Sequence, residues 1–399
     1  MPLSEARVAV IGAGFSGLLL SIALARLGFE VDVYEEHTGP GVPPHCTGII
    51  SRNTLSLIEY IAGPLPGSLI AQKFDGVTIC SQGYCRAFKV LGGLIRLDRP
   101  GLDRHLASIA ARLDVRIHLK TKVTSVAPDG KLKASNSVKA YDYVIIAEGA
   151  RPRLRVELGV GCLEEPAYGV NYITTLNPCR LGRYEPRTTP LVAFERLESP
   201  GYLWAFRDDS HCIVGIASHS TRDIRRLLNT LRGSLKGAYG GPIYIGHTVR
   251  PRLRRGRVTV FGDAACLNKP LSGGGLYPQA LAVKRLLDSA RNRSLARALT
   301  DSVRSVHRTL EASAHLSRLA LRRPKLVKCI LESIKDRLGP IEYDNYRRTA
   351  SQVLSFTRKA SLFSCDTIGS VMGVIALLRG ALESTLNPSL VSHFIRPRG

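Results

Sequence analysis

A glycine-rich turn between a strand pattern and a helix pattern constrains this chain more than any other feature. An apolar strand pattern leads into Gly12-Ala-Gly14-Phe-Ser-Gly17, an apolar helix pattern follows, and a second strand pattern ends at Glu35. Gly12 permits the tight turn, Gly14 lets the backbone approach a pyrophosphate, and Gly17 lets the helix pack on the strand. Glu35 stands where a carboxylate accepts hydrogen bonds from a ribose. The spacing predicts a dinucleotide-binding βαβ unit whose helix N-terminus faces the phosphates.

A second glycine-rich segment indicates which dinucleotide is bound. A short apolar strand pattern over 258–261 runs into Gly262-Asp263, and Pro270 and Gly273-Gly274-Gly275 then precede an amphipathic helix pattern from about residue 276. An acid at a strand end can bind a ribityl hydroxyl. Glycines at a helix start let the backbone lie against a flat ring and point amides at its carbonyl edge. This pair of features suits FAD better than NAD.

Four further motifs follow one another in a fixed order along the chain. They are Pro43-Pro-His45-Cys46-Thr-Gly48, Arg99-Pro-Gly-Leu-Asp103-Arg-His-Leu106, Tyr143-Val-Ile-Ile-Ala147-Glu148-Gly149-Ala150 and Gly201-Tyr202-Leu-Trp204-Ala-Phe206. With these motifs the chain resembles the geranylgeranyl reductase family, within the flavoproteins built like p-hydroxybenzoate hydroxylase. The resemblance runs over about residues 7–290. In three places the chain departs from the family: Glu148 replaces the usual Asp, Arg207 stands where Pro usually follows the Phe, and Asp208 and Asp209 replace the Lys or Gly that often comes next.

The resemblance implies an α/β fold in which a Rossmann-type FAD-binding domain carries an inserted antiparallel β-sheet substrate domain and a C-terminal helical tail. The strand and helix patterns divide the chain accordingly. We expect three FAD-binding parts at 1–70, 98–164 and 251–290, two substrate-domain parts at 71–97 and 165–250, and a C-terminal helical region at 291–399.

The resemblance also adds residues to the candidate site. Cys46 becomes the candidate catalytic residue, as a proton donor or a positioning group beside the flavin, and a loop-packing role is the alternative. Arg99 becomes a flavin contact, with an ion pair to Asp98 or Asp103 as the alternative. The candidate cofactor-binding residues are then Gly12, Gly14, Phe15, Ser16, Gly17, Glu35, Glu36, Cys46, Arg99, Gly262, Asp263, Pro270, Gly273, Gly274 and Gly275.

Three aromatic residues are the main candidates for substrate contact. Tyr202, Trp204 and Phe206 alternate along one strand pattern, so their side chains should share one face of a sheet. The motif match assigns them, together with His45, to the substrate pocket. Ordinary core packing is the alternative.

The charge of the chain bears on its partners. The formal net charge is +24, and 42 of the 56 basic residues are arginine, which pairs well with phosphate. A basic face of this kind suits peripheral contact with anionic lipid, each charge contributing about 1 kcal/mol near the surface. A simply solvated basic face is the alternative. Aromatic residues make up only 6% of the chain and no recognised nucleic-acid motif occurs, so we expect no nucleic-acid partner.

Targeting signals and cysteines add little further chemistry. No apolar run approaches the roughly 20 residues that a spanning helix needs, and no cleavable signal fits before the first strand. We expect a cytoplasmic protein that is peripheral at the inner face of the cell membrane.

The nine cysteines show no C-x-x-C spacing, so we expect no metal site and mostly small buried apolar roles. Cys80 and Cys85 flank a hairpin pattern and are candidates for a disulfide.

The resemblance implies a reaction as well as a fold. It implies an FAD-dependent reductase that saturates C=C bonds of geranylgeranyl chains in archaeal-type ether-lipid precursors, with hydride from reduced flavin and a separate proton. The polyprenyl lipid is then the substrate, and NAD(P)H, ferredoxin or another carrier is the electron donor. An FAD-dependent monooxygenase that hydroxylates or epoxidises an apolar substrate is the alternative enzyme. A basic flavoprotein that binds RNA or a membrane is the alternative of another class.

Overall fold

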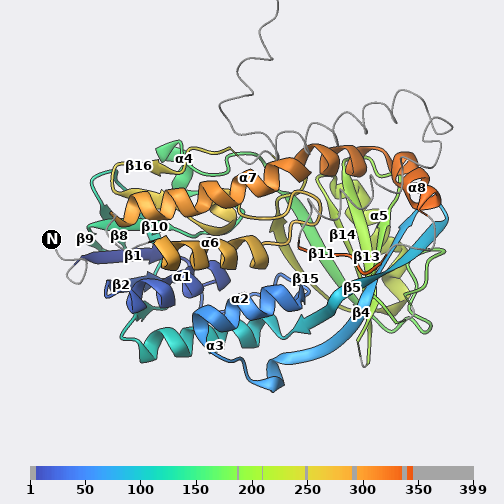
Figure 1. The fold of residues 1–399 in the computed structure, drawn as a ribbon, viewed down its shortest axis with the longest axis horizontal. Coiled ribbons are helices and arrows are strands. Elements are labelled where there is room, and N and C mark those ends of the chain that lie inside the picture. Colours follow the sequence, from blue (N-terminus) through green and yellow to red (C-terminus); the bar gives the residue numbers. More distant parts are fainter. Residues whose placement is uncertain are drawn as a thin grey trace, which may run out of the picture.

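The computed structural model describes residues 6–186, 188–208, 210–247, 250–289, 294–334 and 339–344. Two large sheets lie next to each other and form the two halves of the molecule (Figure 1). One is a six-stranded sheet and the other an eight-stranded sheet, and the chain passes between them several times.

The six-stranded sheet is the nucleotide-binding half. Its strand order is β16-β17-β10-β1-β2-β6, and all neighbours are parallel except the edge pair of β16 and β17. Four of the five residues of β1 and of β2 are buried, as expected for parallel strands that are covered on both faces. Its strands are β1 (Arg7–Ile11), β2 (Glu30–Tyr34), β6 (Arg116–His118), β10 (Tyr143–Ile146), β16 (Arg254–Arg255) and β17 (Val258–Val260).

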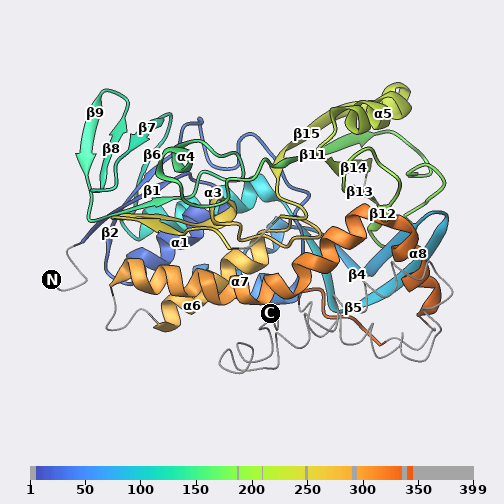
Figure 2. The same cartoon turned by 90° about the horizontal axis from the view of Figure 1, so that it is seen from above.

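Helices cover this sheet and connect it to the rest of the chain. The helix α1 (Phe15–Arg26) follows the first glycine turn and has nine buried residues, so it is enclosed between the sheet and its neighbours. It packs against α2 (Arg52–Ala62), α3 (Arg99–Arg112) and α6 (Leu276–Ser289). A three-stranded sheet of β7 (Val123–Val126), β8 (Lys131–Ala134) and β9 (Ser137–Ala140) lies at the outer end of this half (Figure 2).

The eight-stranded sheet forms the other half. Its order is β15-β11-β14-β13-β12-β4-β5-β3, and every pair is antiparallel except β12 with β4. Its strands are β3 (Ile49–Ser51), β4 (Ile70–Ser81), β5 (Tyr84–Leu97), β11 (Ala167–Thr174), β12 (Leu191–Phe194), β13 (Gly201–Arg207), β14 (Cys212–Ser218) and β15 (Leu235–Ile243). The strand β3 joins this sheet although it lies within residues 1–70, which the sequence places in the FAD-binding half. The helix α5 (Thr221–Leu231) packs on β11 and β14.

Two helices follow the second glycine segment and its helix α6. The long helix α7 (Leu295–Arg322) packs on α6 and reaches β13, so it runs across both halves, and α8 (Pro324–Ser333) packs on β4 and β5 (Figure 2). Both helices fall in the region 291–399 for which the sequence predicts helices. The residues from 345 onward lie outside the described residues. Among the described helices, none has the length and the apolar character needed to cross a bilayer.

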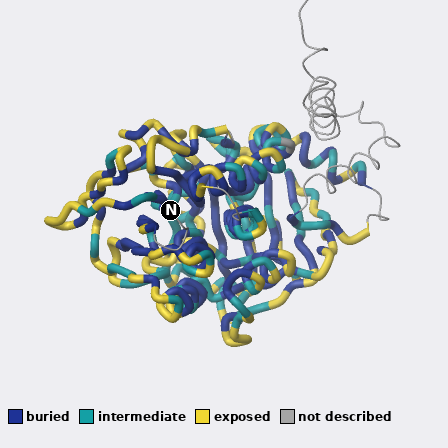
Figure 3. The backbone as a smooth tube through the Cα atoms, turned by 60° about the vertical axis from the view of Figure 1, so that its left-hand side comes forward, coloured by how far each residue is buried: buried dark blue, intermediate teal, exposed yellow. Residues whose placement is uncertain are grey.

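The sheet topology confirms the predicted fold class, a Rossmann-type α/β unit with an antiparallel sheet beside it. The buried residues form the cores of these two units. The buried backbone follows the strands of both sheets, whereas exposed residues gather in the connections (Figure 3). One large apolar cluster fills the nucleotide-binding half, and two others lie on the two sides of the eight-stranded sheet.

The cysteines differ from the expectation of mostly small apolar roles. Cys80–Cys85, Cys162–Cys266 and Cys179–Cys212 form disulfides, and Cys329 is disulfide-bonded as well. The first of these is the hairpin pair that the sequence suggests. The other pairs join residues far apart in the chain, which spacing alone could not reveal. Among the described cysteines only Cys46 is free.

Candidate active site

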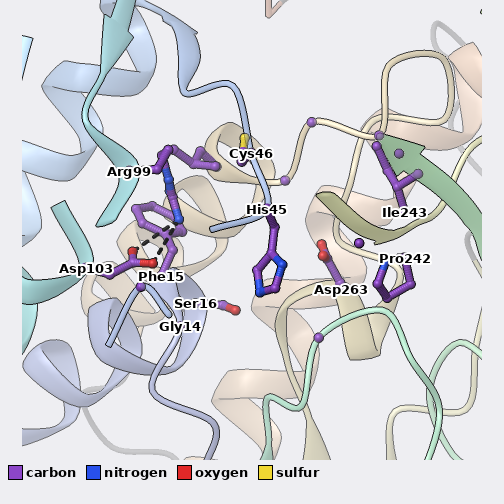
Figure 4. A pocket seen from close by; sticks show the side chains of 18 of the residues that line it. Gly14, Phe15, Ser16, His45, Cys46, Arg99, Asp103, Pro242, Ile243 and Asp263 are labelled. Atoms are coloured by element: carbon purple, nitrogen blue, oxygen red, sulfur yellow. Dashed lines mark hydrogen bonds and ion pairs between the residues drawn. The ribbon is translucent and has the colours of Figure 1, made fainter. Parts of the chain in front are cut away.

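A cavity of about 490 Å³ lies where the two halves meet. Both glycine segments and the loop around Cys46 contribute to its wall. Residues of β12 and β13 in the eight-stranded sheet form another part of the wall. Figure 4 shows residues from the first glycine turn, the Cys46 loop, α3, the end of β15 and the second glycine segment around one space.

The glycines of the first turn differ in the space around them. Gly12 has a φ of +110°, and a Cβ there would collide with the carbonyl of Ala147. A Cβ on Gly17 would collide with the carbonyl of Gly12, because α1 starts against the turn itself. Gly14 is different, since a Cβ there would meet nothing within 4 Å. Gly12 and Gly17 are therefore required by the fold, whereas Gly14 leaves open space at the cavity wall.

Glu35 closes this turn from the end of β2. Its Oε2 accepts a hydrogen bond of 2.8 Å from the backbone N of Ala13, and its Oε1 accepts one of 2.9 Å from the backbone N of His37. Glu35 is buried and lines the cavity. Glu36 also lines it and forms an ion pair of 3.3 Å with Lys122. The carboxylate of Glu35 thus fixes the turn while one side of it faces the cavity.

Arg99 is a buried cation in the wall of this cavity. Its Nη2 lies 3.1 Å from Oδ1 of Asp103, and its guanidinium lies over the ring of Phe15 at 5.4 Å (Figure 4). The side chain is only 11% exposed, and its Nε and Nη1 are buried without a protein partner. Burial raises the pKa of Asp103, and the charge of Arg99 opposes that rise. Of the two acids suggested by the sequence, Arg99 therefore pairs with Asp103 and not with Asp98. Its Nε and Nη1 are left to donate to a ligand in the cavity.

The second glycine segment supplies the opposite wall. Asp263 lines the cavity, and its Oδ1 accepts a hydrogen bond of 2.8 Å from Nε2 of Gln279 in α6. Burial raises the pKa of Asp263 to about 6, while Arg155 and the Gln279 hydrogen bond oppose the rise. A Cβ on Gly275 would collide with Gln279 and lie 3.0 Å from Oδ1 of Asp263. Gly273 and Gly274 line the same wall, and Gly273 has a φ of +65°.

The three alternating aromatic residues all line the cavity, on one face of β13 as their spacing predicts. The hydroxyl of Tyr202 donates a hydrogen bond of 2.7 Å to the carbonyl of Ser272, next to the glycine run. The indole N–H of Trp204 donates one of 2.9 Å to Oδ1 of Asn171 on β11. The polar atoms of both rings are therefore engaged, and their apolar surfaces face the space. Apolar neighbours complete this wall: Val77, Leu94, Leu191, Val192 and Ile243.

The loop that carries His45 and Cys46 lies between the two glycine segments and the sheet. The backbone N of Gly48 donates a hydrogen bond of 3.4 Å to Sγ of Cys46. His45 points toward the space between Ser16 and Asp263 (Figure 4), and its Nδ1 lies 3.3 Å from the carbonyl of Gly240. Both side chains are exposed and line the cavity.

Three predicted cofactor residues do not line the cavity. Gly17 packs under the first turn, and Gly262 lies against Ser16, where a Cβ would collide with the hydroxyl. Pro270 is buried, and its carbonyl accepts a hydrogen bond of 2.7 Å from the backbone N of Gly246. These residues shape the loops that line the cavity. The other predicted cofactor and substrate residues all lie on its wall.

Sequence reasoning missed several residues of the wall. Gln279 stands four residues after Gly275, so helical spacing from the glycine run could have found it. Asn171 and Tyr343 carry no local signal, since they reach the cavity through strand pairing and through a segment near the end of the described chain. Glu148 was seen only as a departure from the family. Its carboxylate accepts hydrogen bonds from the backbone N of Leu154 and from Nη1 of the fully buried Arg155, each at 2.9 Å.

Comparison with known proteins agrees with the fold. Residues 6–185 match the family model described as pyridine nucleotide-disulphide oxidoreductase. The fold and the two glycine segments thus define an FAD-dependent oxidoreductase. More specifically, the chain is similar to a digeranylgeranylglycerophospholipid reductase of Methanosphaera stadtmanae, at 25% identity over 297 residues, which covers 68% of this chain and 74% of the relative.

Solved structures show the same fold at lower identity. A geranylgeranyl bacteriochlorophyll reductase-like protein from Thermoplasma acidophilum superposes with a TM-score of 0.72 at 16% identity, covering 90% of this chain and 97% of the other. A 2-methyl-3-hydroxypyridine-5-carboxylic acid oxygenase superposes with a TM-score of 0.60 at 17% identity, covering 81% of this chain and 93% of the other. The fold is therefore shared by reductase-like proteins and by oxygenases.

Proposed function

We propose that this FAD-dependent oxidoreductase saturates C=C bonds in geranylgeranyl chains of archaeal-type ether-lipid precursors. The observation that carries the proposal is the composition of the cavity beside the glycine segments. Its wall on the eight-stranded sheet is apolar and aromatic, and the ring N–H and O–H groups of Trp204 and Tyr202 are already bonded within the protein. Such a wall suits a ligand without polar groups. The similarity to digeranylgeranylglycerophospholipid reductases supports this choice of ligand.

The residues of the polar wall fit FAD, on the grounds of the open space at Gly14 and the two unpartnered N–H groups of Arg99. We assign the diphosphate to the turn at Gly12, Gly14, Phe15 and Ser16, where backbone N–H groups at the start of α1 meet anionic oxygens. Glu35 holds the ribose, with Glu36 beside it. Asp263 binds the ribityl chain, and Gly273, Gly274 and Gly275 lie along the ring. Arg99 donates to the flavin from the side of Phe15.

Saturation of an unactivated alkene needs a hydride at one carbon and a proton at the other. When bound and reduced, FAD supplies the hydride from N5. The protein must supply the proton and hold the chain, and Cys46 is the residue that we assign to the proton. Its Sγ accepts a hydrogen bond from the backbone N of Gly48, which orients the thiol at the cavity wall. A thiol is a weak acid that could deliver its proton to one alkene carbon as the hydride reaches the other, and the thiolate left behind would regain a proton from solvent, because Cys46 is exposed.

The remaining wall residues position the chain. The rings of Tyr202, Trp204 and Phe206 and the His45 side chain line the same cavity as Cys46. Tyr202 also bonds the carbonyl of Ser272, so it fixes the distance between the aromatic wall and the glycine run. The ring faces offer no polar atom to water or to a ligand. An isoprenoid chain therefore displaces water from this wall and is held by the shape of the cavity.

The decisive experiment is anaerobic. The purified protein with FAD is reduced with dithionite, which replaces the physiological donor, and a geranylgeranylated glycerol phospholipid is added. We expect the flavin to reoxidise in proportion to lipid products that gain two hydrogens per saturated bond. A flavin that stays reduced beside unchanged lipid, across several polyprenyl substrates, contradicts the proposal. Oxygen incorporation into the lipid in air would identify the monooxygenase reaction, which the shared fold makes the second candidate.

We also propose that the protein contacts an anionic membrane surface, where such a lipid resides. Two groups of exposed arginines support this: Arg222, Arg225 and Arg226 on α5, and Arg252, Arg254, Arg255 and Arg257 around β16. Co-sedimentation with vesicles of anionic phospholipid should fall steeply between low and physiological salt. Vesicles of neutral phospholipid are the control. Equal binding to both kinds of vesicle, or a higher affinity for RNA than for vesicles, contradicts a lipid-directed basic face.

A further inference from the structure

A segment near the end of the described chain returns to the cavity. Ile341 pairs with the edge of β5, since its backbone N donates a hydrogen bond of 2.9 Å to the carbonyl of Lys89 and its carbonyl accepts one of 2.9 Å from Leu91. Two residues further on, Tyr343 is a lining residue of the same cavity as Cys46. The segment therefore adds a wall residue from beyond α8, and it packs with an apolar cluster of the eight-stranded half.

The next residue, Asp344, is buried and contacts two segments that are distant from it in the sequence. Its Oδ1 lies 2.5 Å from Nζ of Lys269, which belongs to the loop before the glycine run. Its Oδ2 accepts hydrogen bonds from the hydroxyls of Ser51 and Thr54, at the start of α2. The strand β3 connects this point directly to the loop of Cys46. One carboxylate thus joins the flavin-side loop, the Cys46 side and the returning segment.

Lys269 is the centre of this arrangement. Its side chain is 4% exposed, its Nζ lies 4.3 Å from the centre of the Tyr343 ring, and it donates a hydrogen bond of 3.4 Å to the carbonyl of Tyr343. The backbone of the same residue bonds Gly273 and Gly274, at 2.8 Å and 3.1 Å. The ammonium is therefore fixed to the glycine run on one side and holds Tyr343 by charge and by a cation–π contact on the other.

A buried ion pair adds little net stability, because both charges lose their hydration, but removing one partner leaves the other uncompensated. The best-supported use of such a pair is to fix position. We propose that Tyr343 is a specificity-determining residue of the substrate cavity, limiting the length of isoprenoid chain that fits, and that Asp344 is the residue that positions it through Lys269. This inference rests on the proposed function, because it takes the apolar cavity as the isoprenoid site.

The location of Tyr343 can be tested without turnover, because Trp204 is the only tryptophan of the chain and lines the same cavity. The holoprotein is compared as wild type, Tyr343→Ala and the matched control Tyr343→Phe, which keeps the ring. We expect acrylamide to quench Trp204 fluorescence more strongly in Tyr343→Ala than in Tyr343→Phe. Equal quenching in the two variants would place Tyr343 away from the cavity and overturn the inference.

The specificity role is tested by titrating the same proteins with geraniol, farnesol, geranylgeraniol and the next longer prenyl alcohol, again by Trp204 fluorescence. We expect Tyr343→Ala to gain about tenfold in relative affinity for the longest alcohol, because a five-carbon unit gains space. Tyr343→Phe should keep the wild-type order. The single variants Asp344→Asn and Lys269→Met should lose the wild-type order. The double variant Lys269→Met/Asp344→Leu should also lose it, because no ammonium holds Tyr343, although its stability should recover since no unpaired charge remains buried.

Each failure has a different signature. If the alcohols bind with the expected order but reduced protein saturates none of the lipids, the proposed function falls and the role of Tyr343 stands. If lipids are saturated but all variants keep the wild-type order, the role of Tyr343 and Asp344 falls and the proposed function stands. If no alcohol perturbs Trp204 in the wild type, the specificity role is overturned. A double variant that recovers the wild-type order would show that the Lys269–Asp344 pair does not position Tyr343.

Discussion

The guanidinium of Arg99 lies over the ring of Phe15 at 5.4 Å while its Nη2 stays 3.1 Å from Asp103. Phe15 begins α1 and Asp103 lies in α3, so this one side chain joins two helices that carry different walls of the cavity. Its remaining N–H groups have no protein partner. Arg99 therefore has two separable roles, one in the fold and one toward the cofactor.

We predict that Arg99→Met weakens FAD binding by about tenfold or more, because a charge-assisted hydrogen bond contributes about 1.5–3 kcal/mol. The same change should also lower the free energy of unfolding, since Asp103 is left buried without its cation. The double variant Arg99→Met/Asp103→Leu should recover stability but not FAD binding. Fluorescence titration with FAD and urea denaturation measure the two quantities. Recovery of both by the double variant would show that Arg99 acts only through the fold.

The glycines of the first turn give a matched pair. Gly14→Val should leave the cofactor-free fold intact, since its Cβ meets open space, but should abolish FAD retention by filling the phosphate side of the cavity. Gly17→Ala should instead destabilise the fold by about 1–3 kcal/mol or prevent folding, because its Cβ collides with the backbone. Gly67→Ala, where a Cβ also meets open space, is the control. Normal FAD retention by Gly14→Val would contradict the assigned diphosphate position.

Cys46→Ala should slow lipid reduction by about a hundredfold, the usual contribution of a positioned acid, while leaving bound FAD spectrally unchanged. The rate of lipid reduction by Cys46→Ser should lie between the rates of the wild type and of Cys46→Ala. A hydroxyl keeps a proton at nearly the same place, but it is a weaker acid than a thiol. Single-turnover reoxidation of reduced flavin by substrate checks this without the electron donor. An unchanged rate in Cys46→Ala would assign the residue to loop packing.

FAD affinity should depend on pH through Asp263. Its pKa in the fold is raised to about 6, so its contribution to the stability of the cofactor-free protein is present at low pH and is lost as the pH rises through about 6. A ribityl hydroxyl prefers the ionised carboxylate, so the dissociation constant of FAD should rise by up to about tenfold per pH unit below pH 6. Asp263→Asn should bind more weakly and lose this dependence. A variant that keeps the wild-type pH profile would assign the dependence to another group.

The disulfides should differ in their effect on stability. Cys162–Cys266 joins residues 104 apart in sequence, whereas Cys80–Cys85 joins residues only 5 apart. In the chain-entropy model the long closure contributes about 5 kcal/mol and the short one about 2 kcal/mol. Replacing each pair by alanines should therefore lower the free energy of unfolding in urea more for the first pair. Similar losses for both pairs would indicate that packing, not chain closure, dominates.

The parts of the site that the sequence predicts well are those encoded by local spacing. The turn from Gly12 to Gly17 needs its glycines for contacts within a few residues or with the adjacent strand, so the motif carries the geometry. The shared face of Tyr202, Trp204 and Phe206 follows from strand alternation alone. The Cys80–Cys85 pair lies across one hairpin for the same reason.

The parts that the sequence does not reveal depend on contacts between distant segments. Nothing around Lys269 or Asp344 indicates that they meet, since strand and helix packing brings together residues 75 positions apart. Asn171 becomes part of the wall because β11 pairs with β14, whose neighbour β13 carries Trp204. The long-range cysteine pairs belong to the same class. Local patterns predicted where the cavity lies, whereas tertiary packing decides which polar groups hold its walls together.

The strand order of the six-stranded sheet has a consequence for how the protein is made. Its adjacent strands β1, β10 and β17 begin at residues 7, 143 and 258, and the second glycine run follows β17. During most of its synthesis, the nascent chain thus holds the first glycine turn next to a sheet that still lacks β17. The turn and the glycine run can face each other only after residue 275 has left the ribosome. Capture of the cofactor by both glycine segments is therefore a late step in the synthesis of the chain.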